Sequence, residues 1–186
     1  PTVSHEETLA AYDRLIRAGK VRWIGASNYD AALLSDALSV SKDKGLPRYE
    51  TLQNEYNLYS REKSEGAVRE LALREGVSLL PYYSLAAGFL TGKYRSEADL
   101  DKSPRGQGVA KYLDERGFRI LAALDEVSQR TGAAPSEIAL AWLAAQPAVA
   151  APIASATSLA QLESLVRGAR LVLGEDDLAL LTAAGV

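Results

Sequence analysis

The residues best suited to chemistry lie in the segment Val77–Lys93, which reads VSLLPYYSLAAGFLTGK. Its first four residues, Val77–Leu80, form a short apolar run typical of a strand buried on both faces of a parallel sheet. The loop that follows contains two tyrosines, a serine, two glycines and a final lysine. Tyr82 or Tyr83 could stack on a flat ring, small residues let backbone N–H groups approach, and Lys93 could pair with a phosphate. The segment alone fits two core tyrosines and a solvated lysine equally well.

Length and composition restrict the class of protein. A chain of 186 residues can bury one sizeable core, and nothing in the sequence suggests a second domain. The net charge of −3 gives no reason to expect nucleic acid or an anionic membrane surface as a partner. The lack of cysteine excludes thiolate chemistry, and the single histidine, His5, excludes a histidine-rich metal site and is expected to be solvated. Since no apolar run approaches about 18 residues and no signal peptide is recognisable, we expect a cytoplasmic enzyme or binding protein.

Helix and strand signals alternate along the chain. Ser4 and Glu7 have the spacing of a capping box, and Gly19 fits the left-handed residue that ends a helix. Further helices are predicted over Asp30–Gly45, Glu65–Glu75, Glu115–Arg130, Pro135–Leu143, Leu159–Ala169 and Asp176–Ala183. Strands are predicted over Val21–Ala26, Tyr49–Tyr56, Val77–Leu80 and Val149–Ile153. Such alternation predicts an α/β fold with parallel strands joined by right-handed crossovers.

Polar residues gather where these strands end. Ser27 and Asn28 follow the first strand, Gln53 and Asn54 lie in the second, and the turn 155–161 follows the fourth. The carboxyl ends of parallel strands are where α/β proteins place their ligands, so the clustering favours a ligand site. The buried amides need partners, which are either a satisfied core network or a ligand. No Gly-rich dinucleotide fingerprint, Walker loop or credible Ser–His–Asp arrangement is present.

Five phrases in order resemble the C-terminal part of an aldo-keto reductase. They are PTVSHEETLAAYDRLIRAGKVRWIGASNY, LQNEYNLYSR, PYYSLAAGFLTGKY, SEIALAWLAAQP and ATSLAQLES. The resemblance covers nearly the whole chain and implies a parallel (β/α)8 barrel of the TIM-barrel type. Residues 1–186 would then form a single domain covering about the second half of that barrel, strands 5–8 with their helices. It also implies an oxidoreductase that reduces an aldehyde or ketone to an alcohol with NADPH, with NADH as an open alternative.

The resemblance carries family roles onto particular residues of this chain. Ser27, Asn28 and Gln53 match the residues that hold the nicotinamide carboxamide, and Tyr82 matches the aromatic that stacks on the nicotinamide ring. The loop Leu85–Lys93 matches the segment that wraps the pyrophosphate. The candidate cofactor-binding residues are Ser27, Asn28, Gln53, Tyr82, Tyr83, Ser84, Leu85, Gly88, Lys93, Ser155, Thr157 and Gln161. No metal site is expected.

The turn that would hold the adenosine phosphate departs from the family pattern. Ser155 stands where the family usually has glycine, and Ser158 stands where a basic residue is common. Ser164 and Leu165 replace the acidic residue and asparagine usually offered to adenine. The choice between NADPH and NADH therefore stays open, and Arg95 and Arg105 are candidate substitutes for the contact to the 2′-phosphate.

The family's catalytic aspartate, tyrosine, lysine and histidine lie on the first four strands, before the position that matches Pro1. No catalytic residue can be assigned in this chain, which is also shorter than the about 250 residues of a whole barrel. We therefore expect part of a longer protein, and an isolated fragment without activity. The barrel would be completed by the missing N-terminal half or by self-association, because free strand edges favour pairing. The alternative function is a non-catalytic nicotinamide-binding sensor subunit on the same fold.

Overall fold

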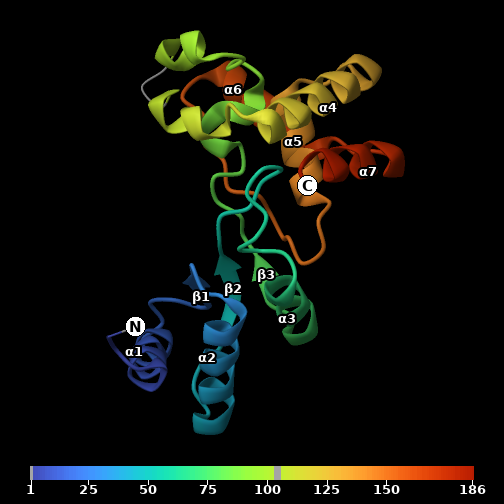
Figure 1. Cartoon of the computed structure of the whole chain (residues 1–186). Coiled ribbons are helices and arrows are strands. Elements are labelled where there is room, and N and C mark those ends of the chain that lie inside the picture. The colour runs from blue at the N-terminus through green and yellow to red at the C-terminus, as the bar shows by residue number, and fades with distance from the viewer. Residues whose placement is uncertain (1, 103–105) are drawn as a thin grey trace.

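The computed structural model describes residues 2–102 and 106–186, and Figure 1 shows their arrangement. The strands are β1 (Ile24–Ser27), β2 (Tyr49–Gln53) and β3 (Ser78–Leu79). The α-helices are α1 (His5–Arg17), α2 (Ala31–Lys44), α3 (Ala67–Glu75), α4 (Glu115–Thr131), α5 (Pro135–Ala144), α6 (Leu159–Arg170) and α7 (Glu175–Ala184). Three short 3-10 helices, η1 (Ala86–Thr91), η2 (Glu97–Lys102) and η3 (Gly106–Tyr112), occupy the long loop after β3.

The helix boundaries follow the capping signals in the sequence. Ser4 Oγ accepts from the Glu7 N–H, and the Glu7 carboxylate accepts from the Ser4 N–H, which confirms the capping box that begins α1. Gly45 ends α2 and Gly76 ends α3, both in the left-handed conformation. Helix α3 begins two residues later than predicted because Gly66, with φ 58° and ψ −128°, is not helical.

The three strands form a parallel sheet in the order β1–β2–β3, with Ser27 opposite Gln53. One sheet face is buried under helices through Ile24, Ala26 and Leu52, and the other is more open. Gly25 lies on the open face opposite Thr51, where an added Cβ would come within 2.2 Å of Thr51 Oγ1. A larger residue at Gly25 would therefore push β1 away from β2.

The predicted fourth strand at Val149–Ile153 is wrong. Val149 forms one isolated parallel bridge with Leu79, and the segment runs on beside β3 through the hydrogen bond from Ile153 N to Pro81 O at 2.8 Å. After that bridge, the next donors of a parallel ladder would be the N–H groups of Pro81 and Pro152. Proline has no N–H, so the ladder stops after one step.

The hydrophobic core is divided into two clusters, whereas the chain length predicted one. One cluster packs the sheet against α1, α2 and α3, and the other joins α4, α5 and α7 to the loop after β3. Figure 1 shows these groups at opposite ends of an elongated molecule. Val149 packs against both clusters. A sheet of three strands is too narrow to reach the later helices, which bury their apolar faces mainly against one another.

A side-chain network connects the segment after β2 to the cluster that contains α4, α5 and α7. The Arg61 guanidinium donates to both oxygens of Glu65, at 2.8 and 3.0 Å, and to the Thr182 carbonyl of α7 at 2.7 Å. Tyr56 donates to Glu65 at 2.7 Å and packs edge-on against Trp142 of α5. Burial acts to raise the pKa of Glu65, and the hydrogen bonds from Arg61 and Tyr56 outweigh it, so the pKa lies below its ordinary value.

The expected parallel α/β architecture is confirmed at the level of this small sheet and its helices. A closed barrel is not formed by the described residues, so the assignment to strands 5–8 of a barrel stays a prediction. In the part of the chain that the structure describes, no helix combines the length and apolar character needed to cross a membrane.

Candidate functional site

The loops after β1 and β3 and the end of β2 meet at one edge of the sheet. Ser27 Oγ donates to the Gln53 carbonyl at 2.9 Å, and the Asn28 N–H donates to the same carbonyl at 3.0 Å. The Tyr82 hydroxyl donates to Asn28 Oδ1 at 2.7 Å. Four residues predicted at the ends of three strands, Ser27, Asn28, Gln53 and Tyr82, are therefore brought together at the carboxyl ends of those strands.

The two amides at this edge have different surroundings. Asn28 adopts the left-handed conformation with φ 59°, and its Nδ2 donates to Ser27 Oγ at 3.1 Å. Gln53 is partly exposed, and among residues 2–102 and 106–186 its side-chain amide has no hydrogen-bond partner. Because Gln53 is opposite Ser27 on the open sheet face, a planar polar group placed there could pair with both amides.

Tyr82 and Tyr83 are clearly different in the structure. Tyr82 is half-buried and fixed through its hydroxyl, whereas Tyr83 is 57% exposed and has φ 52°. Their ring centroids lie 5.4 Å apart with planes inclined by 59°. Tyr82 is therefore the aromatic held beside the Asn28 amide.

The loop Leu85–Lys93 makes a tight turn with unusual backbone angles. Ala86, Ala87 and Gly88 have φ values of 49°, 56° and 98°. A Cβ added at Gly88 would lie 3.9 Å from Lys93 Nζ, so the lysine ammonium sits beside this bare backbone. Lys93 Nζ also lies 5.0 Å from the centre of the Tyr94 ring. An open backbone next to an exposed lysine is suited to a phosphate group.

Ser84 is buried, and its hydroxyl contacts the protein backbone. It lies 3.1 Å from the Pro81 carbonyl and 2.9 Å from the Ile153 carbonyl, both of which can accept its hydrogen bond. This contact fastens the segment after Val149 to the loop after β3. The Ser84 side chain thus positions the chain, and its place among the cofactor-binding residues stays a prediction.

The turn before α6 is ordered by its own side chains. Gln161 Oε1 accepts from the Thr157 N–H at 2.7 Å and from the Thr157 hydroxyl at 3.0 Å, while Ser158 caps the helix. Ser155 is exposed two residues after the Ile153 anchor. The turn therefore lies close to the loop after β3, to which Ile153 is hydrogen-bonded. The side chains of the turn contact mainly one another.

Arg95 is already engaged by the protein. Its guanidinium donates two hydrogen bonds to Asp125 on α4, at 2.7 and 2.8 Å, and a third to the Gly92 carbonyl. The hydrogen bonds to Asp125 raise the pKa of Arg95 above its ordinary value. Arg95 is therefore a poor candidate for the 2′-phosphate contact, and Arg105 lies outside the described residues.

Two buried asparagines support the site in ways that the sequence did not specify. Asn54 was flagged as an amide that needs partners, and its Nδ2 donates to the carbonyls of Tyr29 and Lys63, each at 2.9 Å. Asn57 was missed: its Nδ2 donates to the Tyr83 carbonyl at 3.0 Å, and its Oδ1 accepts two backbone N–H groups. The detectable signal was an asparagine in an otherwise buried segment, where an amide must find partners.

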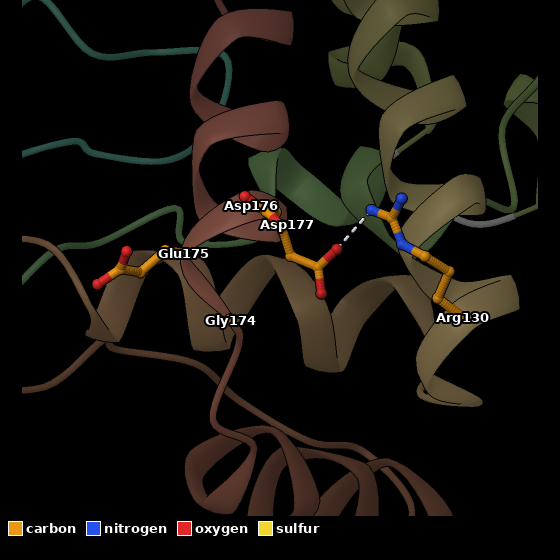
Figure 2. Close-up of a pocket in the computed structure, with 5 residues that line it drawn as sticks. All are labelled: Arg130, Gly174, Glu175, Asp176 and Asp177. Atoms are coloured by element: carbon orange, nitrogen blue, oxygen red, sulfur yellow. Dashed lines mark hydrogen bonds and ion pairs between the residues drawn. The ribbon is translucent and has the colours of Figure 1, made fainter.

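A pocket of about 420 Å³ lies elsewhere, at the beginning of α7 (Figure 2). It is lined by Arg130, Gly174, Glu175, Asp176 and Asp177, and Figure 2 shows Arg130 of α4 directed toward Asp177. Acidic residues in the first turn of a helix stabilise its dipole, which explains their presence. Across the residues that the structure describes, no group of three or more His, Cys, Asp or Glu side chains is arranged to hold a metal ion.

Comparison with known proteins gives a consistent family. A family model described as the Aldo/keto reductase family matches residues 1–185. The Tas protein of Escherichia coli K12 is 36% identical over 189 residues, covering 98% of this chain and 53% of Tas. The aldo-keto reductase dtxS3 of Metarhizium robertsii is 33% identical, covering 95% of this chain and 47% of its own length. The L-glyceraldehyde 3-phosphate reductase of Escherichia coli K12 is 27% identical, covering 87% of this chain and 48% of that reductase.

A solved structure agrees with these sequence matches. The crystal structure of the thermostable aldo-keto reductase Tm1743, in complex with the inhibitor epalrestat, matches with a TM-score of 0.76 and 28% identity. The match covers 100% of this chain and 56% of that reductase. The chain likewise spans about half the length of the curated relatives it matches. The resemblance predicted from five sequence phrases is confirmed: the chain belongs to the Aldo/keto reductase family.

Proposed function

We propose that this chain is the cofactor-binding half of an NADP(H)-dependent reductase that converts an aldehyde or ketone to an alcohol. The observation that carries the proposal is the hydrogen-bonded cluster of Ser27, Asn28 and Tyr82 beside the unpartnered Gln53 amide. Relatives that are named reductases support the oxidoreductase class. In this proposal the chain corresponds to strands 5–8 of a (β/α)8 barrel, and the protein acts in the cytoplasm.

The residues present fit a nicotinamide group. A nicotinamide carries a planar carboxamide on a flat ring, which requires amide partners and an aromatic surface close together. Asn28 and Gln53 offer the amides, and Tyr82 offers a half-buried ring joined to Asn28. Ser27 holds both amide-bearing loops through the Gln53 carbonyl. The arrangement is prepared by hydrogen bonds within the protein and therefore needs little reordering on binding.

NADPH, when bound, supplies the hydride for carbonyl reduction. The residues of this chain would orient the ring: Asn28 and Gln53 would hold its carboxamide, and Tyr82 would stack on one face and leave the other open to a substrate. Gly88 and Lys93 would receive the pyrophosphate, with the exposed Lys93 as a point charge beside the partly buried backbone of Gly88. Ser155, Thr157 and Gln161 receive the adenosine phosphate. Tyr83, Ser84 and Leu85 shape the loop between these regions.

The choice between NADPH and NADH depends on the turn before α6. Arg95 is held by Asp125 and by Gly92, so it does not favour the 2′-phosphate. The Thr157 hydroxyl already donates to Gln161, so in this arrangement it offers no free donor to a phosphate. We therefore propose NADPH as cofactor with only a modest preference over NADH. Titration of both nucleotides measures that preference directly.

The proton donor is proposed to lie outside this chain. Tyr82 brings a hydroxyl to this site, but that hydroxyl already donates to Asn28 Oδ1, so Tyr82 is assigned to orienting the ring and not to proton donation. In this proposal the first half of the barrel supplies the catalytic group, and the isolated chain associates or is unstable. The substrate is a small carbonyl compound, with no role for nucleic acid or a membrane.

The test is a comparison of the whole protein with the isolated 186-residue chain. The whole protein should oxidise NADPH in the presence of a panel of aldehydes and ketones, followed by the loss of absorbance of the reduced nicotinamide. The isolated chain should show no turnover. Turnover by the isolated chain, free of longer species, would place the proton donor inside it. NADPH binding without turnover by the whole protein would favour a sensor subunit over an enzyme.

A further inference from the structure

Asn54 lies directly behind the candidate nicotinamide site and has an unusual hydrogen-bonding pattern. It is 3% exposed, and it follows Gln53 at the end of β2. Its two Nδ2 hydrogens are both used, one by the Tyr29 carbonyl and one by the Lys63 carbonyl, at 2.9 Å each. In contrast, its Oδ1 is buried with no hydrogen-bond partner among the described residues.

The orientation of this amide is fixed by its surroundings. Turning the amide over would place Oδ1 between two carbonyl oxygens, where no donor exists. Burying an acceptor without a partner disfavours folding, and an apolar side chain of similar size would avoid that penalty. The benefit of an asparagine here must therefore come from its two donors.

These donors join the loop after β1 to the segment before α3. Tyr29 directly follows Asn28, so the bond to its carbonyl holds the loop after β1. The Asn54 carbonyl accepts from the Tyr82 N–H at 3.0 Å, which holds the loop after β3. The bond to Lys63 anchors the whole group to the segment before α3. The Asn54 side chain thus holds the loop of Asn28, whereas its bond to Tyr82 belongs to the main chain and is kept by any residue at this position.

We propose that Asn54 is a positioning residue whose side chain sets the geometry of Asn28, and through Asn28 its hydrogen bond with Tyr82, for the nicotinamide end of the cofactor. The proposal rests on the nicotinamide site proposed above and adds a residue that does not itself touch the cofactor. Asn54 should therefore affect binding of the nicotinamide end of the cofactor and leave binding of the adenosine end unchanged.

The test uses Asn54→Asp in the whole protein, with Ser41→Ala as the matched control. The Asp substitution keeps the shape but replaces the two donors with an acceptor facing two carbonyl oxygens. Ser41 is also buried, and its hydroxyl donates to the Leu46 carbonyl at the far end of α2, so its loss destabilises the same core cluster away from the site. Both proteins are titrated with NADPH and with 2′,5′-ADP, which lacks nicotinamide.

Asn54→Asp should weaken NADPH binding about tenfold and change 2′,5′-ADP binding by less than roughly twofold. Burial and the two carbonyl oxygens raise the pKa of the introduced carboxyl, and its protonated form can donate again. NADPH affinity of this variant should therefore recover as the pH is lowered, relative to wild type and Ser41→Ala. Equal weakening of both ligands, or no recovery at low pH, would overturn the positioning role. If Asn54→Asp does not fold, Asn54→Ser provides the same two-ligand comparison.

A failure of the proposed function gives a different result. If the wild-type protein binds no NADPH, the nicotinamide assignment is wrong, and the NMR signals of the Asn28 side-chain amide then decide the structural claim. They should shift in Asn54→Asp and remain in place in Ser41→Ala. Unchanged Asn28 signals in Asn54→Asp would show that Asn54 does not position Asn28.

Discussion

The Tyr82 hydroxyl donates a 2.7 Å hydrogen bond to Asn28 Oδ1, joining residues that are 54 positions apart in the sequence. The bond connects the loop after β3 to the loop after β1 across the end of β2. It fixes the tyrosine ring at the edge of the sheet while the neighbouring Tyr83 ring remains exposed. The stacking and amide functions proposed for this site are therefore coupled through one contact.

Replacing Tyr82 tests the stacking function. Tyr82→Ala should weaken NADPH affinity by about 1 kcal/mol or somewhat more, the size of an aromatic stacking contact. Tyr82→Phe keeps the ring and loses only the hydrogen bond to Asn28, so NADPH affinity should fall by less than in Tyr82→Ala. Calorimetric titration of the whole protein measures both. Tyr83→Ala is the matched control, and a loss confined to Tyr83→Ala would show that the assignment is displaced by one residue.

The backbone of η1 gives a stability prediction. Ala87 has φ 56° and ψ 17°, in a region that disfavours any residue with a Cβ. Ala87→Gly should raise the free energy of unfolding by about 0.5 kcal/mol, because glycine removes the steric conflict in the folded state. The gain is reduced because glycine also increases the conformational entropy of the unfolded chain. Ala122→Gly, at an exposed position inside α4, should lower it by about 1 kcal/mol. Denaturant titration compares the two, and destabilisation by Ala87→Gly would contradict the steric argument.

Much of the fold could be predicted because its signals are local. The Ser4 and Glu7 pair correctly marked the start of α1, and Gly45 correctly marked the end of α2, because capping depends on residues a few positions apart. The failure of the predicted strand at Val149 was only partly visible in its own residues. Pro152 lies inside the predicted strand and is a local signal against it, whereas the missing N–H of Pro81 matters only once the two segments lie side by side. The division of the core likewise depends on how many strands pair.

The site was predictable in its main residues and not in its supports. Ser27, Asn28, Gln53 and Tyr82 lie at strand ends, where polar side chains are conspicuous in a sequence. The left-handed Ala86 and Ala87 carry no signal, because alanine normally avoids that conformation. Arg95 looked available for a phosphate, and its partner Asp125 is 30 residues away on α4. Long-range ion pairs of this kind are not visible without coordinates.

Glu137 provides a pH-dependent prediction. It is buried on α5, and it accepts from Ser164 at 2.9 Å and Arg167 at 3.0 Å on α6, and from the Ala134 N–H. Burial acts to raise its pKa, and these hydrogen bonds outweigh burial, so the folded-state pKa lies below the ordinary value of 4.5. The stabilisation is therefore present above about pH 4.5 and is lost as the pH falls through the lower folded-state pKa.

Glu137→Gln should lower the free energy of unfolding at pH 7 by about 1 kcal/mol or more, and the difference from wild type should shrink below pH 4. Thermal or denaturant unfolding at several pH values measures this difference. The Glu126→Gln variant, which loses an exposed pair with Arg130, is the control and should change stability little. A Glu137→Gln difference that is independent of pH would contradict the assignment.

The outer face of α6 gives a prediction about association. Leu159, Leu162 and Val166 share one helix face, opposite Gly168, which contacts α5, and are 71%, 50% and 42% exposed. At the start of β1, Trp23 is 74% exposed. Apolar surface of this kind drives association, so the isolated chain should form dimers or larger species in sedimentation.

Leu162→Glu should shift that equilibrium toward monomer, whereas Leu73→Glu on α3, with 56% exposure at an isolated position, should not. A cooperative melt of a monodisperse monomer would argue against association as the way in which the isolated chain covers these surfaces.

The most direct test of the account is the structure of the whole protein with NADPH bound. The nicotinamide carboxamide should lie within hydrogen-bond distance, about 3 Å, of the Asn28 and Gln53 side chains, with its ring over Tyr82. The pyrophosphate should lie beside Gly88 and Lys93. A nicotinamide ring bound against Tyr83, or bound away from the ends of β1 and β2, would contradict the proposed site.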